Sequence, residues 1–199
     1  EEAIKNVDVS GSVVYRYDNA GNNRLDAAGN KTGNTTDRNR YKVGLNLSSK
    51  VNDYVKFNSR FIVGSKDNGG FASLNAGKEN NASNTQGEDK QADVTLSNAY
   101  FGFTAIPNTV VNIGKQGLTT PYTVAVDING NEQTGTGILA LSTFGPVTAG
   151  LGYFNNTNLN ASSEINLTQG LGLANFPNGA NGVINGGQDV YVATVQGDL

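Results

Sequence analysis

The chain repeats one pattern along most of its length, in which apolar and polar residues alternate with a period of two. In the first instance Val9, Val13 and Tyr15 fall on one face, and Asp8 and Ser12 fall on the other. Such alternation is typical of a β-strand with one apolar face and one wet face. We therefore expect an all-β fold of about eight antiparallel strands. They are expected near residues 7–17, 40–48, 54–64, 94–104, 109–115, 137–143, 147–154 and 189–196.

The connections between these segments alternate between short and long. Short turns fall at residues 49–53, 105–108 and 144–146, and long segments at about 18–39, 65–92, 116–136 and 155–188. The long segments hold most of the 29 Asn and 26 Gly among the 199 residues. A compact soluble domain rarely carries four such loops, whereas a transmembrane β-barrel has short periplasmic turns and long outer loops. We therefore expect one transmembrane antiparallel β-barrel domain of the outer-membrane porin type.

Composition excludes several classes of function. Without Cys or His, the chain has no thiolate zinc site and no Ser–His–Asp triad. No basic cluster indicates nucleic-acid binding, and the longest apolar run, residues 138–141, is too short for a transmembrane helix. Asp127 and Glu132 could form a glycosidase pair, but no Trp is present to stack on a sugar. We do not expect an enzyme.

Most basic residues within the predicted strands share the polar face. A Lys or Arg on the lipid face of a barrel costs roughly 2–4 kcal/mol at the membrane midplane, so these side chains are expected to line the pore. Lys115 ends the fifth strand on its apolar phase, and we place it at the pore rim. The alternative is one solvated face of a β-sandwich. The expected pore-lining residues are Arg16, Arg40, Lys42, Lys56, Arg60 and Lys115.

Two acids lie in the third long segment, residues 116–136. In large porins the third outer loop folds inward and narrows the channel, and acids on that loop opposite basic wall residues create a transverse field. Asp127 and Glu132 are therefore candidate constriction-loop acids. The alternative is that both are solvated loop carboxylates.

Two groups of residues resemble the major outer membrane porins of Campylobacter and related bacteria. The first is EEAIKNVDVSG at 1–11 with YRYD at 15–18. The second is IGKQ at 113–116, Leu118, Asp127 and GTG at 135–137, which is similar to the entry and exit of that family's constriction loop. The resemblance spans residues 1 to about 155.

The resemblance implies a barrel of about 16–18 strands, so we expect this chain to be the N-terminal half of a longer porin. It implies a homotrimer in the bacterial outer membrane, in contact with lipid and lipopolysaccharide, that passes ions and small hydrophilic solutes. It also implies outer loops that contact host surface molecules. No cofactor is required, but the family places calcium at the constriction. Asp127 matches one calcium ligand, and Asn155 stands where an Asp is expected.

Two other classes remain open on the sequence alone. One is a small closed eight-stranded barrel that serves as an adhesin or an envelope anchor. The other is a soluble β-rich binding domain. Several Gly and Ser on the polar faces favour a wider lumen than a small barrel has, because small barrels are filled by their own side chains.

Overall fold

The computed structural model describes residues 6–21, 25–30, 35–65, 70–74, 92–127, 130–159, 187 and 189–197. Most of the long segments expected at 65–92 and 155–188 lie outside these residues. In the described part of the chain, no helix has the length and apolar content needed to cross a bilayer.

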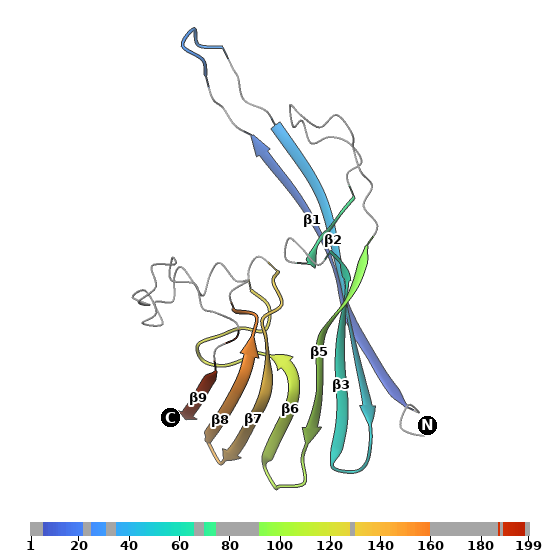
Figure 1. Ribbon diagram of the computed structural model, residues 1–199, viewed down its shortest axis with the longest axis vertical. Coiled ribbons are helices and arrows are strands. Elements are labelled where there is room, and N and C mark those ends of the chain that lie inside the picture. Colours follow the sequence, from blue (N-terminus) through green and yellow to red (C-terminus); the bar gives the residue numbers. More distant parts are fainter. Residues whose placement is uncertain are drawn as a thin grey trace. The chain divides into compact units, whose positions relative to one another are not determined.

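The described strands form one sheet (Figure 1). Along its main path the order is β1-β2-β3-β5-β6-β7-β8-β9, so each long strand pairs with its neighbour in sequence, and the short β4 pairs with β2. No pairing joins β1 to β9 among the described residues. The strands are β1 (Val7–Gly21), β2 (Thr35–Lys50), β3 (Val55–Gly64), β4 (Ala72–Ser73), β5 (Asp93–Phe103), β6 (Thr109–Gly117), β7 (Thr134–Phe144), β8 (Val147–Thr157) and β9 (Val190–Gly197).

The expected all-β fold with eight antiparallel strands is confirmed, although some strand ends differ. β1 and β2 continue to Gly21 and back to Thr35, beyond the ends that alternation indicates. A β-ladder needs backbone partners rather than apolar side chains, so the polar residues around Asp18 stay in the strand. The alternation did not predict β4, because a two-residue strand is too short to show a period.

Two short turns follow directly from their residues. The side-chain oxygen of Asn52 accepts hydrogen bonds from the backbone amides of Tyr54 and Val55, both at 2.9 Å, which closes the β2–β3 turn. Asn108 and Gly145 adopt φ of 54° and 58° in the β5–β6 and β7–β8 turns. Asn and Gly tolerate this left-handed region better than other residues.

The chain divides into two compact units. The first consists of Glu1–Ser10, Leu45–Phe61 and Leu96–Leu199, and the second consists of Gly11–Gly44 and Ile62–Thr95.

In the first unit, one face of five neighbouring strands carries a continuous row of exposed apolar side chains. Phe101, Ile113, Ile138, Tyr153 and Tyr191 are successive partners in the register from β5 to β9. These side chains are between 37% and 75% exposed. Partners in register point to the same side of a sheet, so the row forms an apolar surface that needs an apolar partner other than the unit's own core.

The opposite face of the first unit holds its core. Leu118, Leu139, Phe154 and Leu159 are buried together. Glycine makes this packing possible, because a Cβ at Gly135 would lie 2.9 Å from side-chain atoms of both Leu118 and Phe154. The segment after β6 therefore packs on the face of β7 and β8 that lies opposite the exposed row.

The second unit has a smaller buried group. Ile62, Phe71 and Ala72 are each 3% exposed or less. β4 positions the last two, since Ala72 is paired in register with Tyr41 of β2. The chain after β3 thus returns to β2 and buries Phe71 there.

Candidate functional site

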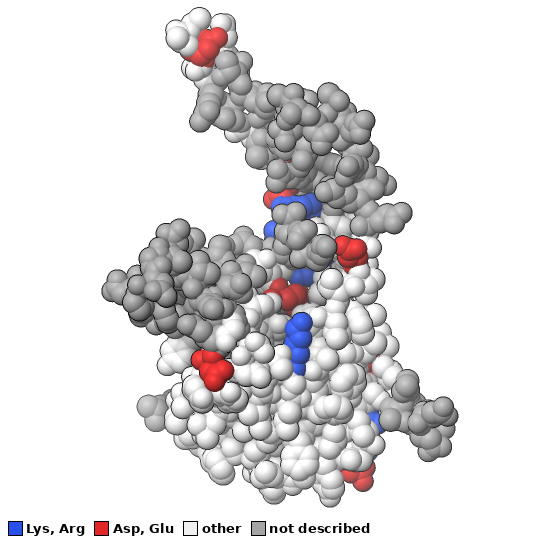
Figure 2. All heavy atoms as spheres, in the orientation of Figure 1, with Lys and Arg blue, Asp and Glu red and all other residues white. Residues whose placement is uncertain are grey.

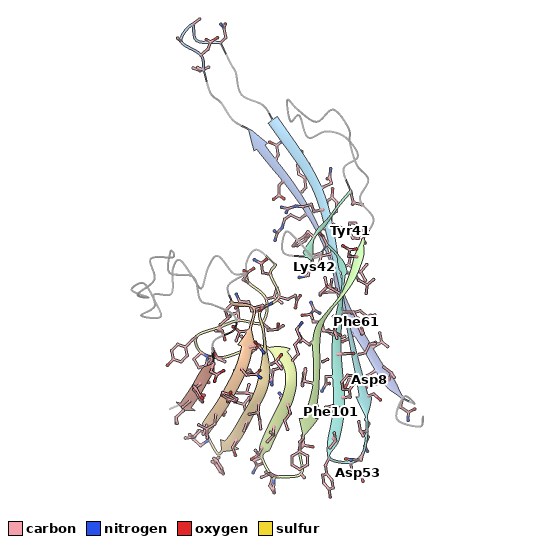
Figure 3. All side chains as sticks on the ribbon, viewed as in Figure 1. Asp8, Tyr41, Lys42, Asp53, Phe61 and Phe101 are labelled. Carbon is pink, nitrogen blue, oxygen red and sulfur yellow. The ribbon has the colours of Figure 1, made fainter. Side chains whose placement is uncertain are left out.

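Burial in β2 is inverted relative to a water-soluble protein. Lys42 is only 5% exposed, whereas Leu45 is 36% exposed. Tyr41 and Lys42 are consecutive on this strand (Figure 3), and consecutive strand residues point to opposite faces. The face of β2 that holds its charge is therefore the covered one, as in a barrel whose apolar residues face lipid.

Three of the expected pore-lining cations gather around Phe71 in the second unit. The guanidinium carbons of Arg16 and Arg40 lie 4.4 and 5.7 Å from the ring centroid, and Lys42 Nζ lies 5.9 Å from it. Arg40 also forms an ion pair with Asp18. Cation–π contacts of this kind stabilise buried cations. Phe71 therefore holds residues 70–74 against the charged face of β2.

In the first unit the structure joins Arg60, a predicted wall residue, to Glu132, a predicted loop acid. Arg60 Nε donates to Glu132 Oε2 at 3.1 Å, and Arg60 Nη2 donates to Oε1 at 3.0 Å. The two side chains are 17% and 15% exposed. A bidentate pair with little solvent contact is among the stronger polar interactions in proteins.

Three further polar side chains support this pair. Arg60 Nη1 donates to Asn46 Oδ1 at 3.0 Å, and Ser97 Oγ donates to Glu132 Oε2 at 3.1 Å. Asn158 Nδ2 donates to the backbone oxygen of Glu132 at 2.5 Å. Sequence reasoning did not single out Asn46, Ser97 or Asn158. Only Asn46 gave a signal, because it shares the polar phase of β2.

The segment between β6 and β7 is folded back on itself. Leu118 N donates to Gln133 O at 2.9 Å, and Gln133 N donates to Ala125 O at 2.7 Å. Val126 and Glu132 form an isolated antiparallel bridge. These bonds, together with the burial of Leu118, hold Glu132 against Arg60 of β3.

Asp127 closes a tight turn within this segment. Its Oδ1 accepts from Asn131 N at 2.8 Å, and its Oδ2 accepts from Asn131 Nδ2 at 2.7 Å. The same D-x-x-G-N sequence recurs at residues 26–30, where Asp26 makes the corresponding bonds to Asn30. Backbone and side-chain hydrogen bonds from Asn30 lower the pKa of Asp26. The repeated five-residue motif could have indicated this role of Asp127 from the sequence.

The described residues do not fit the calcium ion that the family resemblance implies. Calcium takes 6–8 oxygen ligands, but no group of three or more acidic side chains occurs in the described part of the chain. Both carboxylate oxygens of Asp127 already accept hydrogen bonds from Asn131. Asn155 is exposed and contributes no carboxylate.

Lys56 and Lys115, the other two expected pore-lining cations, are not among the partners of the Arg60–Glu132 pair. Lys56 is exposed on β3. Lys115 shares the strand phase of the exposed Ile113, and its Nζ donates to the backbone oxygen of Leu96 at 3.2 Å. In Figure 2 the surface over the lower parts of β3 and β5–β9 carries few charged side chains. Among the described charged residues of the first unit, Arg60 and Glu132 form an ion pair with little solvent contact, whereas Lys56 is exposed.

Comparison with known proteins agrees with the strand pattern and the motifs. A family model described as "Campylobacter major outer membrane protein" matches residues 1–190. Comparison with curated proteins finds no match. The family is one of bacterial outer-membrane porins, and the outer membrane accounts for the exposed apolar row on β5–β9. The chain therefore belongs to the Campylobacter major outer membrane protein family, as the sequence motifs predicted.

Proposed function

We propose that the protein is a general diffusion porin that passes ions and small hydrophilic solutes, and that residues 118–133 narrow its lumen. The observation that supports this is the Arg60–Glu132 pair, which attaches this segment to the polar face of β3. The other face of the sheet exposes apolar side chains, as lipid contact requires. In this proposal the covered polar face is the lumen wall.

The charges of the wall bear on ion preference. Glu132 cancels the charge of Arg60 at contact distance, and Asp18 does the same for Arg40. Direct pairs produce a weaker field across the lumen than opposite charges held apart, because their potentials largely cancel within a few ångströms. We therefore propose weak ion selectivity, with Arg16, Lys42, Lys56 and the rim residue Lys115 as further pore-lining cations.

The proposal includes partners that follow from the family. The exposed apolar row is in contact with outer-membrane lipid, with lipopolysaccharide around the outer part of the barrel. A homotrimer is proposed as the assembly, and host surface molecules are proposed as ligands of the outer loops. Porins are generally non-enzymatic, and we propose conduction without a bound cofactor, so that chelation of divalent cations leaves the current unchanged.

Single-channel recording of the full-length protein in planar bilayers tests this function. We expect stepwise ohmic conductance that persists in EDTA. Absence of conductance steps from protein that is inserted and heat-modifiable would refute the porin proposal. Such a result would favour the small closed barrel. That alternative needs β1 to pair with β9, and no such pairing occurs among the described residues.

A further inference from the structure

A hollow with both polar and apolar lining lies beside Arg60, in the first unit. Its volume is ≈ 240 Å³, somewhat below the roughly 300–1,000 Å³ of pockets for drug-sized ligands. A hollow of this size suits a solute with a single ring. Besides Asp8, Leu47, Ser59 and Arg60, its lining consists of Ser10, Asn46, Ser48, Asn58, Asn98 and Tyr100.

The latter residues share one face of the sheet although they come from four strands. Asn46 and Ser48 are two apart on β2, and Asn98 and Tyr100 are two apart on β5, so each pair points to one side. Arg60 also lines the hollow. The hollow therefore belongs to the same face as the Arg60–Glu132 pair.

The side chains of the hollow are oriented by bonds among themselves. Arg60 can only donate, so its bond to Asn46 Oδ1 fixes the amide oxygen toward Arg60. The amide nitrogen of Asn46 then faces Ser10 Oγ, at 3.5 Å. Ser48 Oγ donates to Asn58 Oδ1 at 3.0 Å, which leaves the NH₂ group of Asn58 as a donor. Oriented amides and hydroxyls bind a ligand without first having to reorganise.

The balance of charge favours an uncharged ligand. The positive charge of Arg60 is matched by Glu132, and Asp8 is the other charged residue of the lining. An ion that leaves water needs a full opposite charge in return. Amides and hydroxyls do not supply one, and Asp8 is exposed to solvent. A neutral molecule with many hydroxyl groups needs hydrogen-bond donors and acceptors instead.

The aromatic ring of Tyr100 adds a second kind of contact. Tyr100 is half-buried in the wall of the hollow. Aromatic rings present a flat apolar face beside a polar tip, which complements the C–H face of a sugar ring. Amides, hydroxyls and one aromatic ring together make a surface for a pyranose.

We propose that this hollow is a weak binding site for neutral saccharides that pass along the lumen wall. The proposal rests on the porin function above. Such a site would raise the local concentration of sugar at the narrowest part of the lumen, and would distinguish sugars from ions of similar size.

Glucose is the probe for the test, applied to the full-length protein. In planar bilayers we expect glucose to reduce the ion current of wild-type channels more than that of Asn58→Leu channels. The variant should need about five- to tenfold more glucose for the same effect, because it loses one or two hydrogen bonds. Solution viscosity slows ions equally in both channels, so the difference between them reports binding. Thr194→Val is the matched control, because Thr194 pairs with the buried Gly150 on the same face but lies outside the hollow.

A second measurement separates this inference from the porin proposal. Saturation-transfer NMR of the detergent-solubilised full-length protein reports glucose binding whether or not the channel conducts, and we expect a signal that Asn58→Leu weakens and Thr194→Val retains. If all three proteins conduct and respond alike to glucose, and none gives an NMR signal, the saccharide site is overturned and the porin function stands. A stronger effect from glucosamine than from glucose overturns the neutral ligand, because it shows a cation site at Asp8.

Discussion

Glu132→Gln is the most direct perturbation of the candidate site. The substitution keeps the shape of the side chain, removes one negative charge and leaves Arg60 without its carboxylate. The wild-type pair is bidentate at 3.0 and 3.1 Å, with Ser97 Oγ as a third partner of the carboxylate at 3.1 Å. The mutation therefore strands one guanidinium that is 17% exposed.

The free energy that Glu132→Gln costs depends on how little solvent reaches the Arg60–Glu132 pair. Breaking a fully buried pair by removing one partner costs about 3–5 kcal/mol, while exposed pairs contribute about 0–1 kcal/mol. The side chains of Arg60 and Glu132 are 17% and 15% exposed, so we expect a loss of about 2–3 kcal/mol in attachment of residues 118–133. At 1.4 kcal/mol for each tenfold, the detached population rises roughly 30- to 140-fold.

Single-channel recording of the full-length protein measures this population as time spent at a second conductance level. We also expect the reversal potential in a salt gradient to move toward anion preference, because one negative charge is lost from the wall. Asp53→Asn is the matched control. Asp53 pairs with Lys50 at 2.8 Å in the β2–β3 turn (Figure 3), where both side chains are largely exposed. That substitution should change neither quantity.

A double substitution separates attachment from charge. Arg60→Met combined with Glu132→Gln removes the stranded guanidinium as well. We expect this protein to recover much of the stability lost in the single variant, because most of the cost is that of an unpaired charge. Glu132→Gln channels indistinguishable from Asp53→Asn channels would refute the reasoning, since they would show that the pair does not hold the segment.

Four further predictions concern other parts of the structure. Phe57→Arg places a cation on the apolar face and should impair membrane assembly by about 2–4 kcal/mol, seen as loss of the heat-modifiable band; normal assembly would show that the face is wrongly assigned. Gly137→Val should destabilise by about 3 kcal/mol in urea unfolding, because a Cβ there would lie 1.9 Å from Tyr153 O; an unchanged midpoint would contradict this packing. Asp127→Ala should lower the melting temperature more than Asp26→Ala, because Asp127 is 5% exposed whereas Asp26 is exposed; equal shifts would contradict the structural role of Asp127. The turn at Asp26 should also loosen as pH falls through the lowered pKa of that carboxyl, measured by amide exchange.

The strands could be predicted because their signal is local. Alternation within about seven or more residues indicates a strand whatever its neighbours are, and all eight expected strands are present. The signal is weaker on a strand face that another segment of the chain covers. Phe154 is fully buried against the segment after β6, although it follows the exposed Tyr153 and continues an alternation that indicated only small residues on that face.

The contacts of the site depended on long-range geometry. Arg60 and Glu132 were each predicted from phase and loop position, but they are 72 residues apart and no sequence pattern specifies their contact. The gathering of Arg16, Arg40 and Lys42 around Phe71 was missed for the same reason. Sequence phase shows the side of a sheet on which a cation lies, but not which segment of the chain returns to cover that side.

The two D-x-x-G-N turns show that one short motif forms the same turn in two different surroundings. Asp26 and Asp127 bind their own chains through equivalent atoms, one in an exposed turn and the other in a covered one. The same hydrogen bonds therefore form in both surroundings. For labelling, this makes residues 26–30 a natural place to insert a fluorophore or an epitope on the intact protein, and residues 127–131 a place to avoid. A reporter at the first turn could then follow the protein on living cells while the lumen stays as it is.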